Sequence, residues 1–457
     1  MKPMRMGFKG WIGLTLLLAG CVPYEPRPLD PEDEWRRLEG LSLDNLKSQG
    51  GASGIGNSDL PPFDYSNGLS SDEAASLAVV LNPALRALRL RAGIADAQII
   101  DAGVLPNPEL DTKWLLPTNA AAWKGEVNAA IDLTQLLLRR GLEKERARIR
   151  AEEIRWDIAA EEWKVAAQAR LAWVDLIYAD EALTVFKETR QILARTLEGV
   201  EDRRKAGDSS TLETILAETD LAEADRQGVR LRSMRRITLQ SLNTLLGLPP
   251  HQDARIEKPA SPLLYAPTQI DRSSLFDHLW QRRPELLAAA KAHEGAEREL
   301  QIACRKQFPG LRLGPSFERD GGKDLLGFNA ALEIPIFNRN HGQIAEKAAL
   351  RDEKLGLFEA ELAAARADLE STLTILEASE SELRILFEEL APRLARMLDL
   401  TERALRAGEV SLFELLTMQR RLLTSRAGVT ESLRDFHRAR IEVERAAGPK
   451  LAKDGPP

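Results

Sequence analysis

Residues 123–133 read Trp-Lys-Gly-Glu-Val-Asn-Ala-Ala-Ile-Asp-Leu, in which apolar or small side chains mostly alternate with polar ones. In a β-strand, alternate side chains point to opposite faces, so this pattern predicts one apolar and one polar face. About eleven residues are enough for a tilted strand to cross a bilayer. From Gly141 the sequence becomes helical and contains no further Pro or Gly until Gly199. The stretch therefore predicts a membrane strand that leads into a helix of about 90 Å or more.

The same arrangement occurs twice in the chain. Several Pro and Gly residues recur 201 positions later, which indicates two copies of one unit at about 71–249 and 272–450. This period is much longer than that of solenoid repeats. The recurring pairs are Pro83 and Pro284, Pro108 and Pro309, Gly141 and Gly342, Gly207 and Gly408, and Gly247 and Gly448.

The N-terminus has the features of a signal peptide. Residues 1–20 contain a basic start and a short apolar core, too short to span a bilayer as a helix. They end at Leu-Ala-Gly before Cys21, a sequence that resembles a lipobox, so we expect a covalent lipid on Cys21. The alternative is an ordinary secretory signal with an incidental Cys. Residues 21–69 are rich in Pro, Gly and Ser and are interpreted as a lipid-anchored linker.

Composition favours an envelope protein and argues against a nucleic-acid partner. The formal net charge is −7, and removal of the three basic residues of the signal peptide leaves −10. Apart from Cys21 the chain has only Cys304, so no intrachain disulfide is expected. The five His residues lie singly, without metal-ligand spacing, and there is no phosphate-binding loop or nucleophile elbow. We therefore expect neither an enzyme, nor a bound metal, nor a cofactor other than the lipid.

Each repeat contains one predicted β-hairpin, at 108–136 and at 309–337. Four strands are too few to close a membrane barrel, because the known closed barrels start at about eight strands. An open sheet in lipid would leave edge N–H and C=O groups unpaired, at several kcal/mol each. If the strands lie in a membrane, strands from other copies of the chain must complete the wall, and the strand count alone does not say how many copies.

Each repeat also contains a predicted helical hairpin, at 142–247 and 343–447, whose long first helices cover 142–205 and 343–406. Gly at the turn suits the left-handed residue that ends a helix. Glu213 and Glu414 then have the spacing of capping boxes with Ser210 and Ser411. An alternative is that both acids project into a lumen and form a gate. The residues of the two tips are Arg203, Lys205, Ala206, Gly207, Arg406, Ala407 and Gly408.

Several stretches resemble the outer membrane efflux protein (TolC) family over roughly residues 70–448. They include the lipobox, Asn-Pro-Ala-Leu at 82–85, Leu-Pro-Asn-Pro-Glu-Leu at 105–110, and Arg-Ala-Gly-Glu-Val-Ser-Leu-Phe-Glu-Leu-Leu at 406–416. The sequence of residues 105–110 is most similar to that of the heavy-metal-efflux branch of this family. Glu414 matches an acid at the periplasmic constriction of the family, whereas Thr417 stands where a second acid is often found. This departure weakens the expectation of a gate with two acids.

The resemblance implies a mainly α-helical protein with a transmembrane β-barrel contribution, built from a duplicated helix–β-hairpin–long helix–helix unit. It implies a homotrimer with a twelve-stranded barrel in the bacterial outer membrane and a long α-barrel in the periplasm. It also implies that the tips dock a periplasmic membrane-fusion adaptor, which connects the duct to an inner-membrane efflux pump. The remaining segments are a linker at 250–271 and a tail at 451–457.

We expect the protein to be a passive exit duct of a tripartite efflux system that exports small solutes, with metal cations and drugs as candidate classes. The alternatives are a periplasmic coiled-coil adaptor and an envelope lipoprotein with a structural, binding or hydrolytic role. An adaptor would carry an all-β module between its helices, whereas here a hairpin precedes each long helix. The sequence does not specify the exported solute, the pump or the adaptor.

Overall fold

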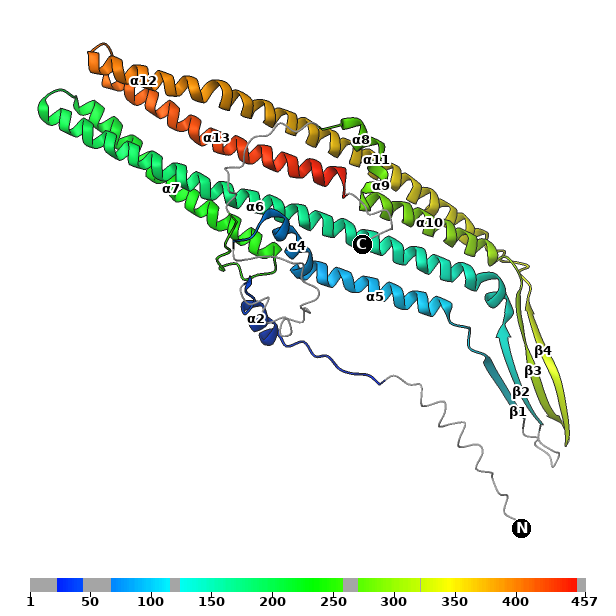
Figure 1. Ribbon diagram of the computed structural model, residues 1–457. Helices are drawn as coiled ribbons and strands as arrows, with labels where there is room; N and C mark the ends of the chain where they lie inside the picture. Colours follow the sequence, from blue (N-terminus) through cyan, green and yellow to red (C-terminus); the bar gives the residue numbers. More distant parts are fainter. Residues whose placement is uncertain (1–22, 44–66, 116–123, 258–269, 321, 450–457) are drawn as a thin grey trace.

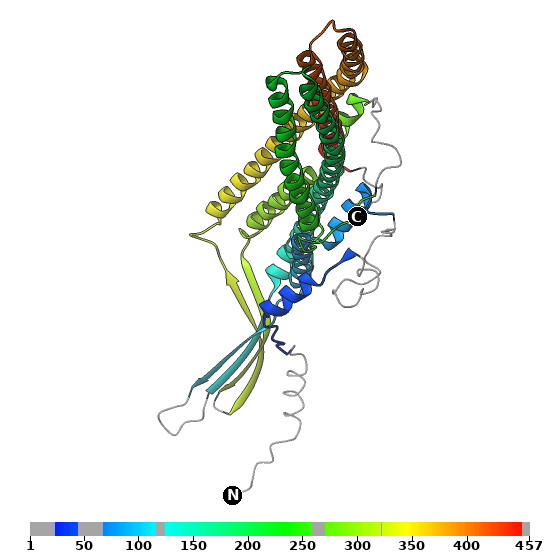
Figure 2. The same ribbon diagram turned by 90° about the vertical axis from the view of Figure 1, so that its left-hand side faces the viewer.

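The computed structural model describes residues 23–43, 67–115, 124–257, 270–320 and 322–449. The molecule is elongated, with four β-strands at one end and the two helical-hairpin loops at the other (Figures 1 and 2). The long helices run side by side between these ends. The mainly helical architecture with a duplicated unit, expected from the sequence, is confirmed.

The first repeat begins with a capped helix pair. Ser70 and Glu73 form the capping box of α4, Ser71–Leu81, and the Asn82 side chain accepts from the first backbone N–H groups of α5, Pro83–Gly103. The elements that follow are β1 (Glu109–Leu115), β2 (Lys124–Asp132), the π-helical turn η1 (Gln135–Arg139), α6 (Arg140–Ala206) and α7 (Thr211–Leu245). With 67 residues, α6 is about 100 Å long.

The second repeat follows the same order but differs in its long helix. The long helix expected over 343–406 is present as one continuous helical run, and a π-helical segment, η2, interrupts its α-helical geometry. The elements are α8 (Arg272–Asp277), α9 (Leu279–Arg282), α10 (Pro284–Arg305), β3 (Gly310–Asp320), β4 (Lys323–Glu333), α11 (His341–Arg384), η2 (Ile385–Leu390), α12 (Ala391–Ala407) and α13 (Leu412–Ala447).

The two π segments change the offset between the repeats. Core residues of α6 and α11 correspond at an offset of 200, as the buried pairs Ala169 and Leu369, and Trp173 and Leu373, indicate. A π turn accommodates one more residue than an α turn. Thus η1 adds one residue to the first repeat before α6, which lowers the offset from 201 to 200. The segment η2 adds one residue to the second repeat before α12, which restores 201. The offset is therefore not 201 throughout, although it returns to 201 at the tips.

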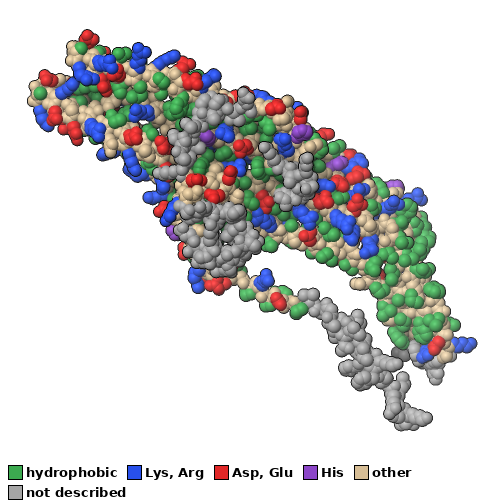
Figure 3. All heavy atoms as spheres, viewed as in Figure 1, with side chains coloured by type: hydrophobic (Ala, Val, Ile, Leu, Met, Phe, Trp, Pro, Cys, Tyr) green, Lys and Arg blue, Asp and Glu red, His purple; other side chains and the backbone are tan. Residues whose placement is uncertain are grey.

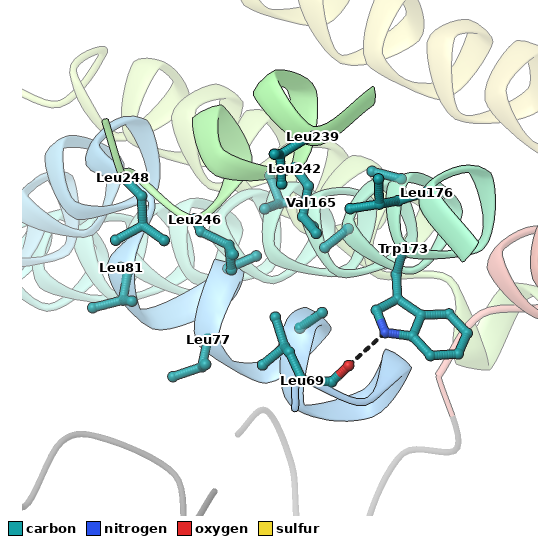
Figure 4. Packing of buried hydrophobic residues seen from close by; sticks show 14 of the residues in the cluster. Leu69, Leu77, Leu81, Val165, Trp173, Leu176, Leu239, Leu242, Leu246 and Leu248 are labelled. Atoms are coloured by element: carbon teal, nitrogen blue, oxygen red, sulfur yellow. Dashed lines mark hydrogen bonds between the residues drawn. The ribbon is translucent and has the colours of Figure 1, made fainter. Parts of the chain in front are cut away.

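Two hydrophobic cores hold the repeats together at mid-length. In the first, Leu residues of α4 and α7 pack around α6, and the Trp173 Nε1–H donates to the Leu69 carbonyl at 2.6 Å (Figure 4). In the second, α11 and α13 pack on α9 and α10, with Phe436 fully buried. These cores fix the direction of the long helices and so place the strands and the tips at opposite ends.

The segment expected to be a linker is partly structured. It contains α2, Pro31–Glu39, which buries none of its residues, and it continues to Leu43, which lies in the first core. The proposed signal peptide, Cys21, the first hairpin turn and the tail at 451–457 lie outside the described residues. In the linker between the repeats, Ile256 forms a parallel bridge with Leu69.

Candidate functional site

Within the described residues, the strands form one antiparallel sheet in the order β1-β2-β3-β4. The central pairing joins the two repeats through β2 and β3. A Cβ placed on Gly314 would lie 1.7 Å from the Ala129 carbonyl oxygen, so this close approach requires glycine. In the described part of the chain, β1 and β4 each pair with a single neighbour, which leaves two open edges.

The strand register places apolar side chains of all four strands on one face. Val127 of β2 lies between Thr112 of β1 and Phe317 of β3, and Phe317 lies opposite Leu326 of β4. This face is exposed: Trp114, Leu326 and Phe328 have 62%, 87% and 86% of their surface accessible. The other residues of the face include Leu110, Ile131, Leu313 and Leu332. Figure 3 shows the gathering of hydrophobic side chains over the strand end.

The opposite face of the sheet carries charged side chains that pair across strands. Lys124 of β2 lies 2.6 Å from Glu318 and 3.2 Å from Asp320 of β3. Arg312 of β3 reaches Glu109 of β1 at 2.9 Å. The alternation predicted from the sequence is thus present on all four strands, and it gives a wall with one apolar and one polar surface.

The two helical hairpins turn in the same way at the opposite end. Gly207 and Gly408 have φ of +88° and +75°, in the left-handed region that favours glycine. In the first tip the Asp208 N–H donates to the Arg203 carbonyl at 2.8 Å, and in the second the Glu409 N–H donates to the Ala404 carbonyl at 2.9 Å. The tip residues predicted from the sequence therefore lie at two neighbouring loops at one end of the molecule.

Both candidate gate acids form capping boxes. The Glu213 carboxylate accepts from the Ser210 N–H at 2.8 Å, and the Glu414 carboxylate accepts from the Ser411 N–H at 2.7 Å. The Ser210 N–H, together with the Ser209 hydroxyl, lowers the pKa of Glu213 below its ordinary value. Glu213 therefore stays ionised at neutral pH as a helix cap. A gate formed by the acids of several copies stays a prediction.

One charged pair near the tips was missed in the sequence. Arg420 of α13 lies 2.5 Å from Asp220 of α7, and the Asp220 side chain is only 14% exposed. The pair bridges two helices that otherwise hardly touch, next to a cavity of about 1100 Å³ between α6, α7 and α13. No sequence pattern distinguishes this pair, because Arg and acidic residues occur throughout these helices.

Neither a metal cluster nor an apolar spanning helix is found in the described ranges. No group of three or more His, Cys, Asp or Glu residues there is arranged to hold a metal ion. No helix in the same ranges is both long and apolar enough to cross a membrane.

These features define a class of protein: an elongated subunit with an amphipathic β-sheet at one end and helical hairpins at the other. Residues 275–449 match the family model described as outer membrane efflux protein. The resemblance noted in the sequence is confirmed: the second repeat matches the model of this family, and most of the chain has the fold of solved outer-membrane channels.

Comparisons with individual proteins agree with this family. The pyoverdine export outer membrane protein OpmQ of Pseudomonas putida is 29% identical over 49% of the chain, which spans about half (48%) of that relative. The cobalt-zinc-cadmium resistance protein CzcC of Cupriavidus metallidurans is 23% identical over 87% of the chain and 94% of CzcC. The crystal structure of CusC, a transmembrane channel, superposes with a TM-score of 0.70 at 18% identity, covering 83% of this chain and 92% of CusC.

Proposed function

We propose that the chain is one subunit of a homotrimeric exit duct in the outer membrane, through which a tripartite efflux system exports small solutes. The observation that carries this proposal is the sheet with an exposed apolar face, a charged face and two open edges. In lipid, such edges are tolerated only when other strands pair with them. Three copies supply twelve strands, with β4 of each copy paired to β1 of the next.

The two faces of the sheet are proposed to have different surroundings in the membrane. Apolar side chains such as Trp114 and Phe328 contact lipid, and the charged residues around Lys124 and Glu318 line a wet pore. The long helices then extend the duct into the periplasm. Such a duct needs no catalytic group, so the protein is proposed to be a passive channel and not an enzyme.

The hairpin tips are proposed to dock a periplasmic membrane-fusion adaptor, which connects the duct to an inner-membrane pump that supplies the energy. The tip residues Arg203, Lys205, Arg406 and the two Gly turns lie at the end farthest from the sheet. Glu213 and Glu414 are proposed to form the periplasmic constriction when three copies meet. Carboxylates gathered there would favour the passage of cations.

A lipid on Cys21 is proposed as a second anchor in the outer membrane. A covalent acyl chain contributes about 0.8 kcal/mol for each buried methylene group, so several chains hold the N-terminus stably. The exported solute is proposed to be small and polar or charged, because the proposed lumen face is charged. The names of the relatives include a pyoverdine exporter and a cobalt-zinc-cadmium resistance protein, so chelated or free metal cations are one candidate class.

The experiment is a mass measurement in detergent followed by planar-bilayer recording on the purified, acylated protein. We expect a particle of three copies that conducts ions, and a Cys21→Ala variant that conducts equally once inserted. A monomer without current would contradict the proposal. A periplasmic adaptor, the main alternative, would give no conductance at any oligomeric state.

A further inference from the structure

The second repeat packs on the first in three places within one chain. Strand β3 pairs with β2, and helices α10 and α13 both pack on α6. Because the repeats are copies of one unit, each of these contacts predicts a counterpart between two copies of the chain, in which a first repeat packs on a second repeat. Among the described residues of a single chain, the strand counterpart is missing, since β4 and β1 are both edge strands.

The contact between α10 and α6 has a defined register. Lys291 pairs with Glu152 at 2.8 Å, and Arg298 pairs with Glu145 at 3.0 Å. Between these ion pairs the two helices come close, because a Cβ placed on Gly295 would lie 3.7 Å from the Ile149 side chain. The small residue thus belongs to α10 and the large residue to α6.

The counterpart of this α10 face on α5 is an apolar stripe. At the offset of 201 that relates α5 to α10, Lys291, Gly295 and Arg298 correspond to Leu90, Ile94 and Ala97. Leu90 is 71% exposed and Ile94 is 60% exposed. The other side of α5 is already engaged with α6 of its own chain, through Arg89 with Glu162 and Asp96 with Arg155.

The counterpart of the α6 face on α11 is a row of mostly small residues. At the offset of 200 that the cores establish for α6 and α11, Glu145, Ile149 and Glu152 correspond to Ala345, Ala349 and Asp352. All three are exposed, as is Gly356 one turn farther along. In the contact between α10 and α6, the small residue belongs to α10 and the large one to α6. In the pair α5 and α11 the large side chains belong to α5 and the small ones to α11.

We propose that the α5 stripe of one copy packs on the α11 face of a second copy, with Ile94 over Ala349 of that copy. This inference rests on the proposed trimer and adds its helical contact and register. Ile94 then fills the space above Ala349 as Ile149 fills the space above Gly295. The charged pairs of the intrachain contact are replaced by Leu90 and Ala97, so the contact between copies is mainly apolar.

The register can be tested by disulfide cross-linking of the full-length acylated trimer in a Cys304→Ser background. The variant with Ile94→Cys and Ala349→Cys tests this register, because a disulfide forms only where the two Cα atoms lie about 4.4–6.8 Å apart. After mild oxidation we expect covalent dimers and trimers on non-reducing gels, in most of the protein.

The matched control pairs Ile94→Cys with Leu350→Cys, the register that an unbroken offset of 201 would give. One residue rotates the side chain by about 100° around the helix, so little cross-link is expected. Stronger cross-linking in the control overturns the register. Absence of cross-links with both pairs, in a particle whose mass is that of three copies, overturns the α5–α11 contact but leaves the duct intact. A monomeric mass overturns the proposed function itself.

Discussion

The two repeats hold the N-terminus of corresponding helices, α5 in the first repeat and α10 in the second, by different chemistry. In the first neck, which we define as Asn82 and its partners, all hydrogen bonds are neutral. The buried Asn82 side chain accepts from the Ala84 and Leu85 N–H groups at 2.9 and 3.2 Å, and it donates to the Leu245 carbonyl at 3.1 Å. One side chain thus caps α5 and connects it to the end of α7.

In the second neck, defined as Arg283 and its partners, the same position carries a charge. Arg283 is 7% exposed and donates to Asp368 at 3.1 Å and to the Ala365 carbonyl at 3.3 Å. Asp368 also accepts from Arg445 at 2.8 Å, so α10, α11 and α13 meet at one carboxylate. The side chain at this N-cap makes no capping hydrogen bond.

The same topology can therefore be held by a local helix cap or by a network of ion pairs. A neutral cap depends on a single side chain and is insensitive to pH. A network of partly buried ions links more elements, but removal of the shared partner leaves the other ions partly desolvated and with fewer charges to pair with. We therefore expect the second neck to be the more fragile of the two.

The largest expected effect is that of Asp368→Ala. It leaves Arg445 with Glu442 and Arg283 with Glu285, but it removes the shared carboxylate, and we expect a loss of about 3 kcal/mol. Asn82→Ala removes one cap and one donor, which costs about 1–2 kcal/mol. Thermal unfolding followed by far-UV circular dichroism in detergent should rank the two variants in this order.

A control for this ranking is Asp435→Ala on α13, where an exposed carboxylate pairs with the adjacent Arg434. Exposed pairs contribute little to stability, so the unfolding temperature should hardly change. Equal destabilisation by Asp368→Ala and Asn82→Ala would contradict the distinction between an ionic and a neutral neck.

The sequence predicted the elements that depend on local patterns. Alternation identified the strands, and the Ser, Asn and Gly signals placed the caps at Ser70, Asn82 and Gly207, because these depend on neighbouring residues. The π segment at Ile385–Leu390 and the shared carboxylate at Asp368 were not foreseen. Both depend on which residues face one another between distant helices, and a count of positions along the chain does not contain that information.

A smaller effect is expected when the turn glycines of the two tips are replaced. Gly207→Val and Gly408→Val each place a β-branched residue at positive φ, at a cost of about 1–2 kcal/mol. Because a Cβ at either position meets no atom within 4 Å, the strain should stay local and the trimer should persist. Solute export from intact cells should fall in both variants.

The two tips also differ in charge. The first tip has Arg203, Arg204 and Lys205 before its Gly, whereas the second has only Arg406 within its last turn. Equal loss of export from both Val variants would indicate that backbone shape is what the adaptor recognises. Unchanged export from both would argue against docking at the tips.

The smallest expected effect is a pH dependence confined to the second neck. Burial alone would raise the pKa of Asp368, but the hydrogen bond and charge of Arg445, together with Arg283, hold it below its ordinary value. A lowered pKa in the folded state means that this stabilisation is complete above about pH 4 and is lost as the pH falls through the folded-state pKa.

Trp163 donates to the Arg445 carbonyl at 3.1 Å and reports on this neck, whereas Trp173 reports on the first repeat. In fluorotryptophan-labelled protein, the Trp163 signal should shift below pH 4 before that of Trp173, and Asp368→Asn should abolish this early step. Simultaneous shifts of both signals in the unmodified protein would mean that acid loosens the two necks together.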